Sequence, residues 1–546
     1  MNCEGRIFIV FQVSSPKVLV QHGVLCKQGL IVSFGYSPIS AAVPAQGMLL
    51  GFLSLTCTFE SLLGCSYGRT FFKFPTERQA LFFSGNGSGR PETDRQFTMT
   101  ERTIIKNISI INEGQIVVQN LLIDNGIIQK IGQLDEDNDA KSIDGTGKYL
   151  FPGIIDGQVH FREPGLTHKG DIYTESRAAV AGGVTSFIDM PNTFPNVLTI
   201  DILNRKYQIA SEKSLANFGF FLGVNGDNLD YVINLDTSKL LGVSDDGLYF
   251  TKKGNLLADN PETMEKLFAN CKSIIAIHSE KEQIVEENEQ LYRGKYGENV
   301  PIEFHPIIRS EKACYEATKR AIEIANKHKA RLHILHLTTE AETYLFRNDI
   351  PLQEKNITTE VSVHHLWFSD KDYQRLGTLI KWNPAIKTEK DKRGLLKALL
   401  DDRIDIVTTD HAPHTLDEKQ KPYFQSMSGA PIVQHSLNIM LEFYKQGLIS
   451  LEKIAEKMCH NPAILYSIEK RGFIREGYFA DLTIVDLHSS WTVDKKNILS
   501  KCGWSPLEGT TFKTKVTHTF VNGNLVYDNG HFHETKKGQA LSVTNK

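Results

Sequence analysis

Short apolar runs alternate with longer amphipathic segments between residues 153 and 411. The apolar runs are rich in Val, Ile, Leu and Phe, whereas intervening segments such as 262–271 and 315–328 show helical spacing of apolar residues. This alternation is typical of βα units that surround a parallel sheet. Eight such units predict a (β/α)8 TIM barrel with insertions over 153–469. The predicted strands are 153–160, 184–190, 218–224, 240–247, 273–278, 331–337, 358–366 and 405–411.

The segments on either side of this region have a different pattern. Residues 99–152 and 470–535 carry β-branched alternation and Asn-Gly turns, the ordinary signals of β-hairpins. We expect the two segments to pair into one composite β-sandwich domain that flanks the barrel, with 536–546 as a C-terminal tail. The predicted fold class is therefore α/β: a TIM barrel with a β-sandwich built from both flanks.

The first 98 residues look unlike the rest of the chain. The run GMLLGFLSLTCTF (47–59) is too short to span a bilayer, and it lies too far from the start to be an ordinary signal peptide. Residues 84–96 then read as a linker before Met99. We expect 1–98 to be an extension outside the functional fold; the alternative is a genuine extra domain or a targeting segment.

Composition narrows the class of protein without identifying a function. Of 546 residues, 41% are hydrophobic and 23% are charged, and the formal net charge is −3, so no basic excess indicates nucleic-acid binding. We expect no membrane partner either. The eight cysteines form no CxxC pair, which favours a reducing, cytoplasmic location.

Candidate metal ligands stand at the carboxyl ends of four predicted strands. His160, His278, His336 and Asp410 each follow an apolar run, so each should emerge at the mouth of the barrel. A single histidine at such a place is as often a structural polar group as a ligand. Four together favour a metal site, because imidazole and carboxylate suit zinc and leave a position open for water.

Five motifs together carry a specific resemblance. They are DGQVHFREPG (156–165), MPNT (190–193), LHILHLTT (332–339), KWNPAI (381–386) and TTDHAPH (408–414). This set resembles dihydroorotase, of the cyclic amidase family in the amidohydrolase superfamily, from about Met99 to about residue 530. REGYFADLTIVD (475–486) further resembles the return of that superfamily's chain into its β domain.

The resemblance implies a reaction and roles for individual residues. It implies reversible, zinc-dependent conversion between (S)-dihydroorotate and N-carbamoyl-L-aspartate in pyrimidine (UMP) synthesis, with Asp410 as general acid and base. Arg162, Asn192 and His414 match positions that bind the substrate carboxylate, for which the planar fork of arginine is suited. Asn383 matches a contact to the substrate ring, although NPAI is equally typical of a simple turn. His364 and His365 are expected to be structural.

Two departures from the family pattern bear on the metal site. Gln158 stands where many relatives have a histidine, on the same strand face as His160. It would coordinate weakly, bind a metal-bound water, or leave one metal position unfilled. The fourth predicted strand lacks the lysine of many relatives, and Lys252 and Lys253 come only after that strand. Asp246, in the sequence Asp-Asp-Gly, is either a substitute ligand or part of a solvated turn. We expect one tightly bound Zn2+ and an altered but functional site; a second ion is the alternative.

Two other functions remain open from the sequence. One is another cyclic amidase, an allantoinase or dihydropyrimidinase, whose substrate needs no carboxylate clamp. The other is a non-catalytic scaffold that partners aspartate carbamoyltransferase, suggested by Gln158 but disfavoured by the retained Asp410 and Arg162. The expected partner is otherwise a small-molecule substrate, and the family resemblance suggests a homodimer.

Overall fold

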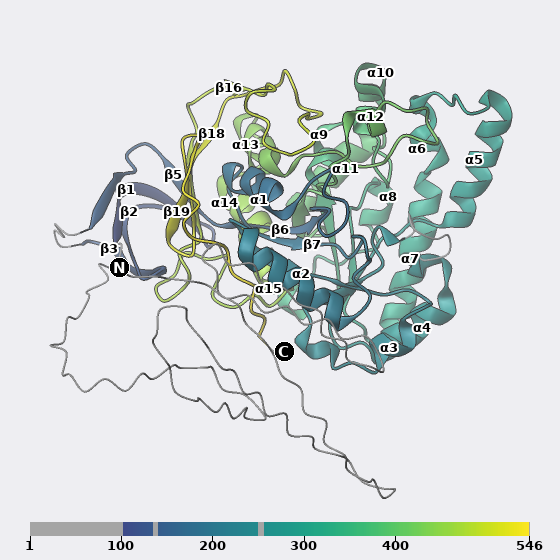
Figure 1. Ribbon diagram of the computed structural model, residues 1–546, viewed down its shortest axis with the longest axis horizontal. Helices are drawn as coiled ribbons and strands as arrows, with labels where there is room; N and C mark the ends of the chain where they lie inside the picture. The colour runs from purple at the N-terminus through teal and green to yellow at the C-terminus, as the bar shows by residue number, and fades with distance from the viewer. Residues whose placement is uncertain (1–101, 135–139, 249–255, 545–546) are drawn as a thin grey trace, which may run out of the picture. The chain divides into compact units, whose positions relative to one another are not determined.

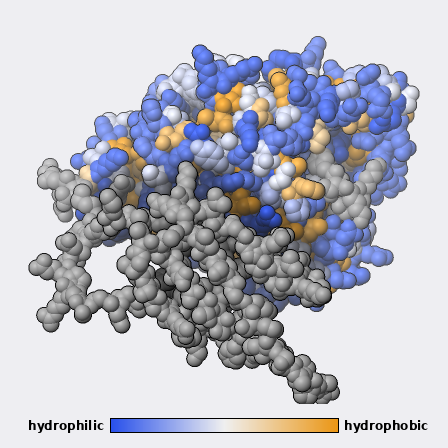
Figure 2. Space-filling model, in the orientation of Figure 1, coloured by the Kyte–Doolittle hydropathy of each residue, from blue (hydrophilic) through white to orange (hydrophobic). Residues whose placement is uncertain are grey.

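The computed structural model describes residues 102–134, 140–248 and 256–544 (Figure 1). The expectation for residues 1–98 falls outside these ranges, as do Lys252 and Lys253. In the part of the chain that is described, no helix combines the length and apolar character needed to cross a bilayer. The face seen in Figure 2 is largely hydrophilic, with scattered hydrophobic residues.

The middle of the chain closes into a parallel barrel, which confirms the predicted fold class. Every neighbouring pair of barrel strands is parallel, and β9 continues β8 after the single residue Phe221. The backbone N–H of His160 donates to His411 O at 2.8 Å, which joins the first strand to the last. The strands are β6 (Ile154–Val159), β7 (Val184–Asp189), β8 (Asn217–Phe220), β9 (Leu222–Gly223), β10 (Gly242–Ser244), β11 (Ile274–Ile277), β12 (Leu332–Ile334), β13 (Ile357–Ser362) and β14 (Ile406–Thr408).

Amphipathic helices surround the strands (Figure 1), and most of the longer ones begin with a capping side chain. Asp171 forms a capping box with Thr174 at the start of α1, and the Ser310 side chain accepts from Ala313 N at the start of α7. Buried residues recur every three or four positions along α7, so one face of this helix packs toward the barrel. The longer helices are α1 (Ile172–Ala181), α2 (Ile200–Lys213), α4 (Pro261–Asn270), α5 (Glu282–Tyr296), α7 (Glu311–His328), α11 (Glu389–Leu400) and α13 (Ser436–Lys445).

The predicted strand 358–366 is too long. The strand ends at Ser362, and Val363–Trp367 form the short helix α9. Val363, His364 and Leu366 are all buried, so the buried positions of the run do not fall on one face. Such a run has no period that separates strand from helix.

The two flanking segments form one nine-stranded sheet beside the barrel. Its centre is β5 (Tyr149–Pro152), which pairs in parallel with β1 (Thr103–Asn112) and antiparallel with β15 (Leu482–Asp486). Segments more than three hundred residues apart therefore share one core, as predicted. The other strands are β2 (Gln115–Asp124), β3 (Ile127–Gly132), β4 (Lys141–Asp144), β18 (Lys515–Val521), β19 (Asn524–Asp528) and β20 (His531–Phe532).

The last described residues return to the barrel. Leu541 N donates to Phe218 O at 2.8 Å, and Phe218 N donates to Gln539 O at 3.0 Å, so this segment pairs with β8. The segment predicted as a tail thus contributes to the packing around the third barrel strand.

Candidate active site

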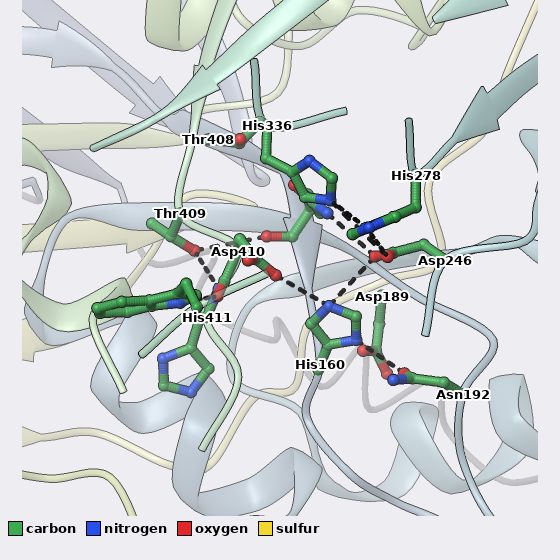
Figure 3. A network of polar contacts seen from close by, with 12 residues as sticks. His160, Asp189, Asn192, Asp246, His278, His336, Thr408, Thr409, Asp410 and His411 are labelled. Atoms are coloured by element: carbon green, nitrogen blue, oxygen red, sulfur yellow. Dashed lines mark hydrogen bonds and ion pairs between the residues drawn. The ribbon is translucent and has the colours of Figure 1, made fainter. Parts of the chain in front are cut away.

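The predicted metal ligands converge at the carboxyl ends of the barrel strands (Figure 3). His160 follows β6, His278 follows β11, His336 follows β12 and Asp410 follows β14. All four side chains are buried. The left-handed backbone angles of His336 (φ 37°) and Asp410 (φ 47°) turn the chain sharply at the strand ends. Such strained non-glycine residues persist where the surrounding structure fixes them.

Asp246 joins two groups of donor atoms. His160 Nε2 lies 3.0 Å from Asp410 Oδ1 and 3.3 Å from Asp246 Oδ2. Asp246 Oδ1 lies 3.7 Å from His278 Nδ1 and 3.9 Å from His336 Nε2. In each group the donor atoms lie within 4.8 Å of one another. The Asp246 side chain is 5% exposed, so the alternative of a solvated turn does not hold.

Gln158 faces the same group. Its Nε2 donates to Asp246 Oδ2 at 3.0 Å, while its Oε1 is buried and has no hydrogen-bond partner among the described residues. If the side-chain amide of Gln158 were flipped, its oxygen would lie against the Asp246 carboxylate, and the two oxygens would repel each other. The unpartnered oxygen therefore fits a neutral metal ligand, which is weaker for zinc than imidazole.

The electrostatics of the cluster favour a cation. Burial alone would lower the pKa of His160, yet contacts with Asp246 and Asp410 raise it to about 10. Burial likewise opposes a raised pKa at His278, but Asp246 and Glu280 bring it to about 9. The carboxylates thus stabilise positive charge on the imidazoles. A divalent ion would replace these protons, since neutral imidazole is the ligand form.

Residues that are not themselves candidate ligands orient the ligands. His278 Nε2 lies 2.8 Å from Glu280 Oε2, and Glu280 also pairs with Arg309. His160 Nδ1 lies 2.7 Å from Asn192 Oδ1, so Asn192 contacts a candidate ligand as well as lining the pocket. Partners of this kind fix the ring orientation and tautomer of metal-binding histidines. The only sequence signal for Glu280 was its place two residues after His278.

The predicted substrate-binding residues lie beside this cluster. Arg162, Asn192 and Asn383 line one pocket together with His160, Asp246, Asp410 and Trp382. The Arg162 guanidinium donates from Nε to Pro413 O at 3.1 Å, and its Nη2 lies 3.0 Å from His414 Nε2. Asn383 Oδ1 accepts from Ser428 Oγ at 3.0 Å.

His364 and His365 have structural surroundings, as expected. The His364 ring stacks on Trp382 with 4.0 Å between centroids, and His365 Nε2 lies 3.2 Å from Pro384 O. Neither ring belongs to a candidate ligand group among the described residues.

Comparisons with known proteins agree with this architecture. The chain is 33% identical over 417 residues to a dihydroorotase of Methanosarcina acetivorans, covering 74% of this chain and 88% of that protein. It is 31% identical over 454 residues to a dihydroorotase of Pyrococcus furiosus, covering 83% and 96%. The structure of the L-hydantoinase (dihydropyrimidinase) from Arthrobacter aurescens superposes with a TM-score of 0.75 at 25% identity, over 81% of this chain and 100% of that one. Residues 149–526 match the model of the amidohydrolase family, and the chain belongs to that family.

Proposed function

We propose that the protein is a dihydroorotase, which interconverts (S)-dihydroorotate and N-carbamoyl-L-aspartate by opening and closing a cyclic amide. The observation that carries this proposal is the buried Arg162, which lines the same pocket as His160, Asp246 and Asp410. A buried guanidinium beside a pocket is suited to an anionic ligand. Dihydroorotate carries a carboxylate that hydantoin-type rings lack. The names of the relatives from M. acetivorans and P. furiosus support the same reaction.

The donor set supports a zinc ion in this site. Three imidazoles, two carboxylates and the amide oxygen of Gln158 are ligand types that zinc accepts. When bound, the ion would polarise the amide carbonyl and lower the pKa of a water molecule. We propose that one ion is held tightly, because the neutral amide of Gln158 replaces an imidazole in the group around His160.

Asp410 is the proposed general acid and base. Burial raises the pKa of Asp410, although contact with His160 opposes the shift, so this carboxylate accepts a proton more readily than an exposed one. In hydrolysis it would take the proton of the attacking water and deliver it to the leaving amide nitrogen. In ring closure the same carboxylate would take the proton from the nitrogen as the C–N bond forms and deliver it to the oxygen whose bond to the carboxyl carbon breaks, so that water leaves.

An activity assay tests the proposal directly. Full-length protein loaded with zinc should hydrolyse dihydroorotate and cyclise N-carbamoyl-L-aspartate, whereas dihydrouracil and allantoin should be poor substrates. Preferred turnover of a ring without a carboxylate would instead support the other cyclic amidases. No turnover of any ring by the purified protein would favour the scaffold role beside aspartate carbamoyltransferase.

The remaining parts of the proposal concern location and assembly. We propose a cytoplasmic enzyme, which is supported by the free state of the four cysteines in the described residues. We also propose a homodimer, on the basis of the family resemblance. Gel filtration with light scattering would measure the mass of the assembly.

A further inference from the structure

Part of the pocket is lined by two segments, residues 381–383 and 427–429, which we call the pocket wall. The residues of the wall that line the pocket are Trp382, Asn383, Ser428 and Gly429. Ser428 Oγ donates to Asn383 Oδ1 at 3.0 Å, so side chains join the two segments where they line the pocket. Because Arg162 lines the same pocket, a ligand that fills it also contacts this wall.

A buried lysine holds the backbone of the pocket wall. Lys419, the last residue of α12 (Leu416–Lys419), is fully buried. Its Nζ donates to Met427 O and Gly429 O, both at 2.8 Å, and to Lys381 O at 3.0 Å. Gly429 N also donates to Lys381 O, at 2.8 Å. One amine therefore bonds to both segments of the wall.

These three contacts require the charged form of Lys419. Burial lowers the pKa of the amine well below its ordinary value, which opposes the charge. All three partners are carbonyl oxygens, however, and only a protonated amine has three N–H groups to donate. A buried charge is unfavourable unless it is hydrogen-bonded in this way. The wall thus depends on a single ammonium group for three hydrogen bonds to its backbone.

We infer that Lys419 is a positioning residue for ligand binding. Its bonds to the residues before and after Ser428 fix the place of that hydroxyl, which in turn orients the amide of Asn383 in the pocket. Lys419 acts only through the wall, because its own partners are backbone carbonyls. The inference deepens the proposed function and rests on it for the identity of the ligand, whereas the link between Lys419 and the wall does not depend on that function.

The chain offers a matched control at the other end of the barrel. Lys457 is also buried, and its Nζ donates to Ile404 O at 2.8 Å and pairs with Asp402 at 2.8 Å. Ile404 precedes β14, whereas Asp410 follows it, so Lys457 contacts the end of this strand that lies away from the site. Loss of either lysine removes a buried donor, but only Lys419 contacts the pocket wall.

Hydrogen exchange tests the link to the wall without a ligand. In Lys419→Met we expect peptides that span 427–430 to exchange about tenfold faster than in the wild-type protein, because the segment loses its buried donor. In Lys457→Met the same peptides should exchange at the wild-type rate, whereas a general loss of stability would affect both variants alike. Wild-type exchange at 427–430 in Lys419→Met would overturn the inference.

Kinetics test the consequence for binding. In Lys419→Met we expect the KM for dihydroorotate to rise about 5- to 20-fold. The kcat should fall by no more than about threefold, because no contact of Lys419 reaches a candidate metal ligand. Lys457→Met should lower the melting temperature and keep the wild-type KM. A purely structural role would give the same result in Lys419→Met, and this outcome would overturn the inference.

A double-mutant cycle tests whether Lys419 acts through Ser428. Ser428→Ala removes the hydroxyl bonded to Asn383, and we expect its KM to rise about 3- to 10-fold. The KM of Lys419→Met/Ser428→Ala should lie within about twofold of the higher single variant. A KM that equals the product of the two single increases would mean independent effects and would overturn the inference. If Lys419→Met does not fold, the same cycle with Lys419→Gln decides.

The outcomes for this inference and for the proposed function are distinguishable. Normal turnover of dihydroorotate with a KM independent of Lys419 would overturn this inference alone. If the wild-type protein binds dihydroorotate without turnover, the proposed reaction is overturned, and the Kd from calorimetry replaces KM in the cycle. If it prefers another ring, that ring replaces dihydroorotate in every assay. Failure to bind any ring would overturn both.

Discussion

At the scale of single residues, the site depends on polar side chains whose charges are held out of water. Arg162 has a left-handed backbone (φ 69°) and is 5% exposed, so the turn after β6 presents its guanidinium to the pocket instead of to solvent. Taking a charged side chain out of water is unfavourable unless it meets partners there. The hydrogen bonds of Arg162 are to neutral groups, Pro413 O and His414. Its charge is therefore available to an anion.

Replacement of Arg162 by Met should abolish recognition of this anion. We expect kcat/KM for dihydroorotate to fall about 100- to 1,000-fold, because a bidentate charged contact is lost. Steady-state kinetics measure the change, with circular dichroism to verify the fold. Arg320→Met on the exposed face of α7 is the matched control and should match the wild-type protein. Equal kcat/KM in Arg162→Met would rule out the carboxylate clamp.

Asp156 gives a prediction about pH and stability. It lies buried below the site, where Thr409 donates to it from Oγ1 at 2.6 Å, and burial raises its pKa from 3.8 to about 7. Between about pH 4 and 7 the folded state therefore binds more protons at Asp156 than the unfolded state does. The free energy of unfolding attributable to Asp156 must then fall as the pH rises through this window.

Asp156→Asn removes this titration. The free energy of unfolding of the variant minus that of the wild type should therefore be larger at pH 8 than at pH 4.5. The increase should be on the order of 1–3 kcal/mol. Urea denaturation at both pH values measures the difference. Parallel stability curves for the two proteins would contradict a raised pKa at this residue.

At the scale of elements, the site depends on how closely the ends of two strands approach. Gly247 follows β10 with a φ of +70°, and a Cβ atom there would lie 2.0 Å from Asn192 Nδ2, after β7. Asn192 in turn contacts His160. The absence of a side chain at Gly247 thus allows the loop carrying Asp246 to lie against the residue that orients a candidate ligand.

Gly247→Ala should disturb the site through this contact. We expect at least about a tenfold loss of kcat/KM and weaker zinc binding, because Asn192 must leave His160 Nδ1. Gly114→Ala is the control: its φ is +77°, and a Cβ there meets no atom within 4 Å. It should lower stability by about 1 kcal/mol and leave activity unchanged. Equal activity of both variants would contradict the proposed coupling.

The sequence predicts the secondary-structure elements more accurately than it predicts where they end or which residues they bring into contact. The barrel strands were predicted from apolar runs, but the run through His364 and His365 continued into α9, where burial on all sides hides the period. Asp246 could not be distinguished from a turn residue until its oxygens were placed between His160 and His278. Glu280 was missed because a single carboxylate two residues after His278 is not a signal by itself, and its second partner, Arg309, lies farther along the chain.

At the scale of the whole molecule, five barrel strands must assemble before a metal site exists. We therefore expect about one tightly bound zinc per chain, and its removal by a chelator should lower both activity and the melting temperature. Elemental analysis after dialysis measures the content. Two tightly bound ions would overturn the single-ion proposal and would fit Asp246 as a bridge between the two donor groups. No bound ion would indicate a degenerate site.

The boundary of the functional fold gives the last prediction. The first described strand, β1, begins at Thr103 and lies between β2 and β5, and the described site residues all come later in the chain. A chain that begins at Met99 keeps every one of these contacts. We therefore expect it to match the full-length protein in melting temperature and, within about twofold, in kcat. A chain that begins at Gln115 lacks β1, which exposes the edges of β2 and β5, and it should be insoluble. If the Met99 chain were also insoluble or inactive, residues 1–98 would have to be counted as part of the enzyme.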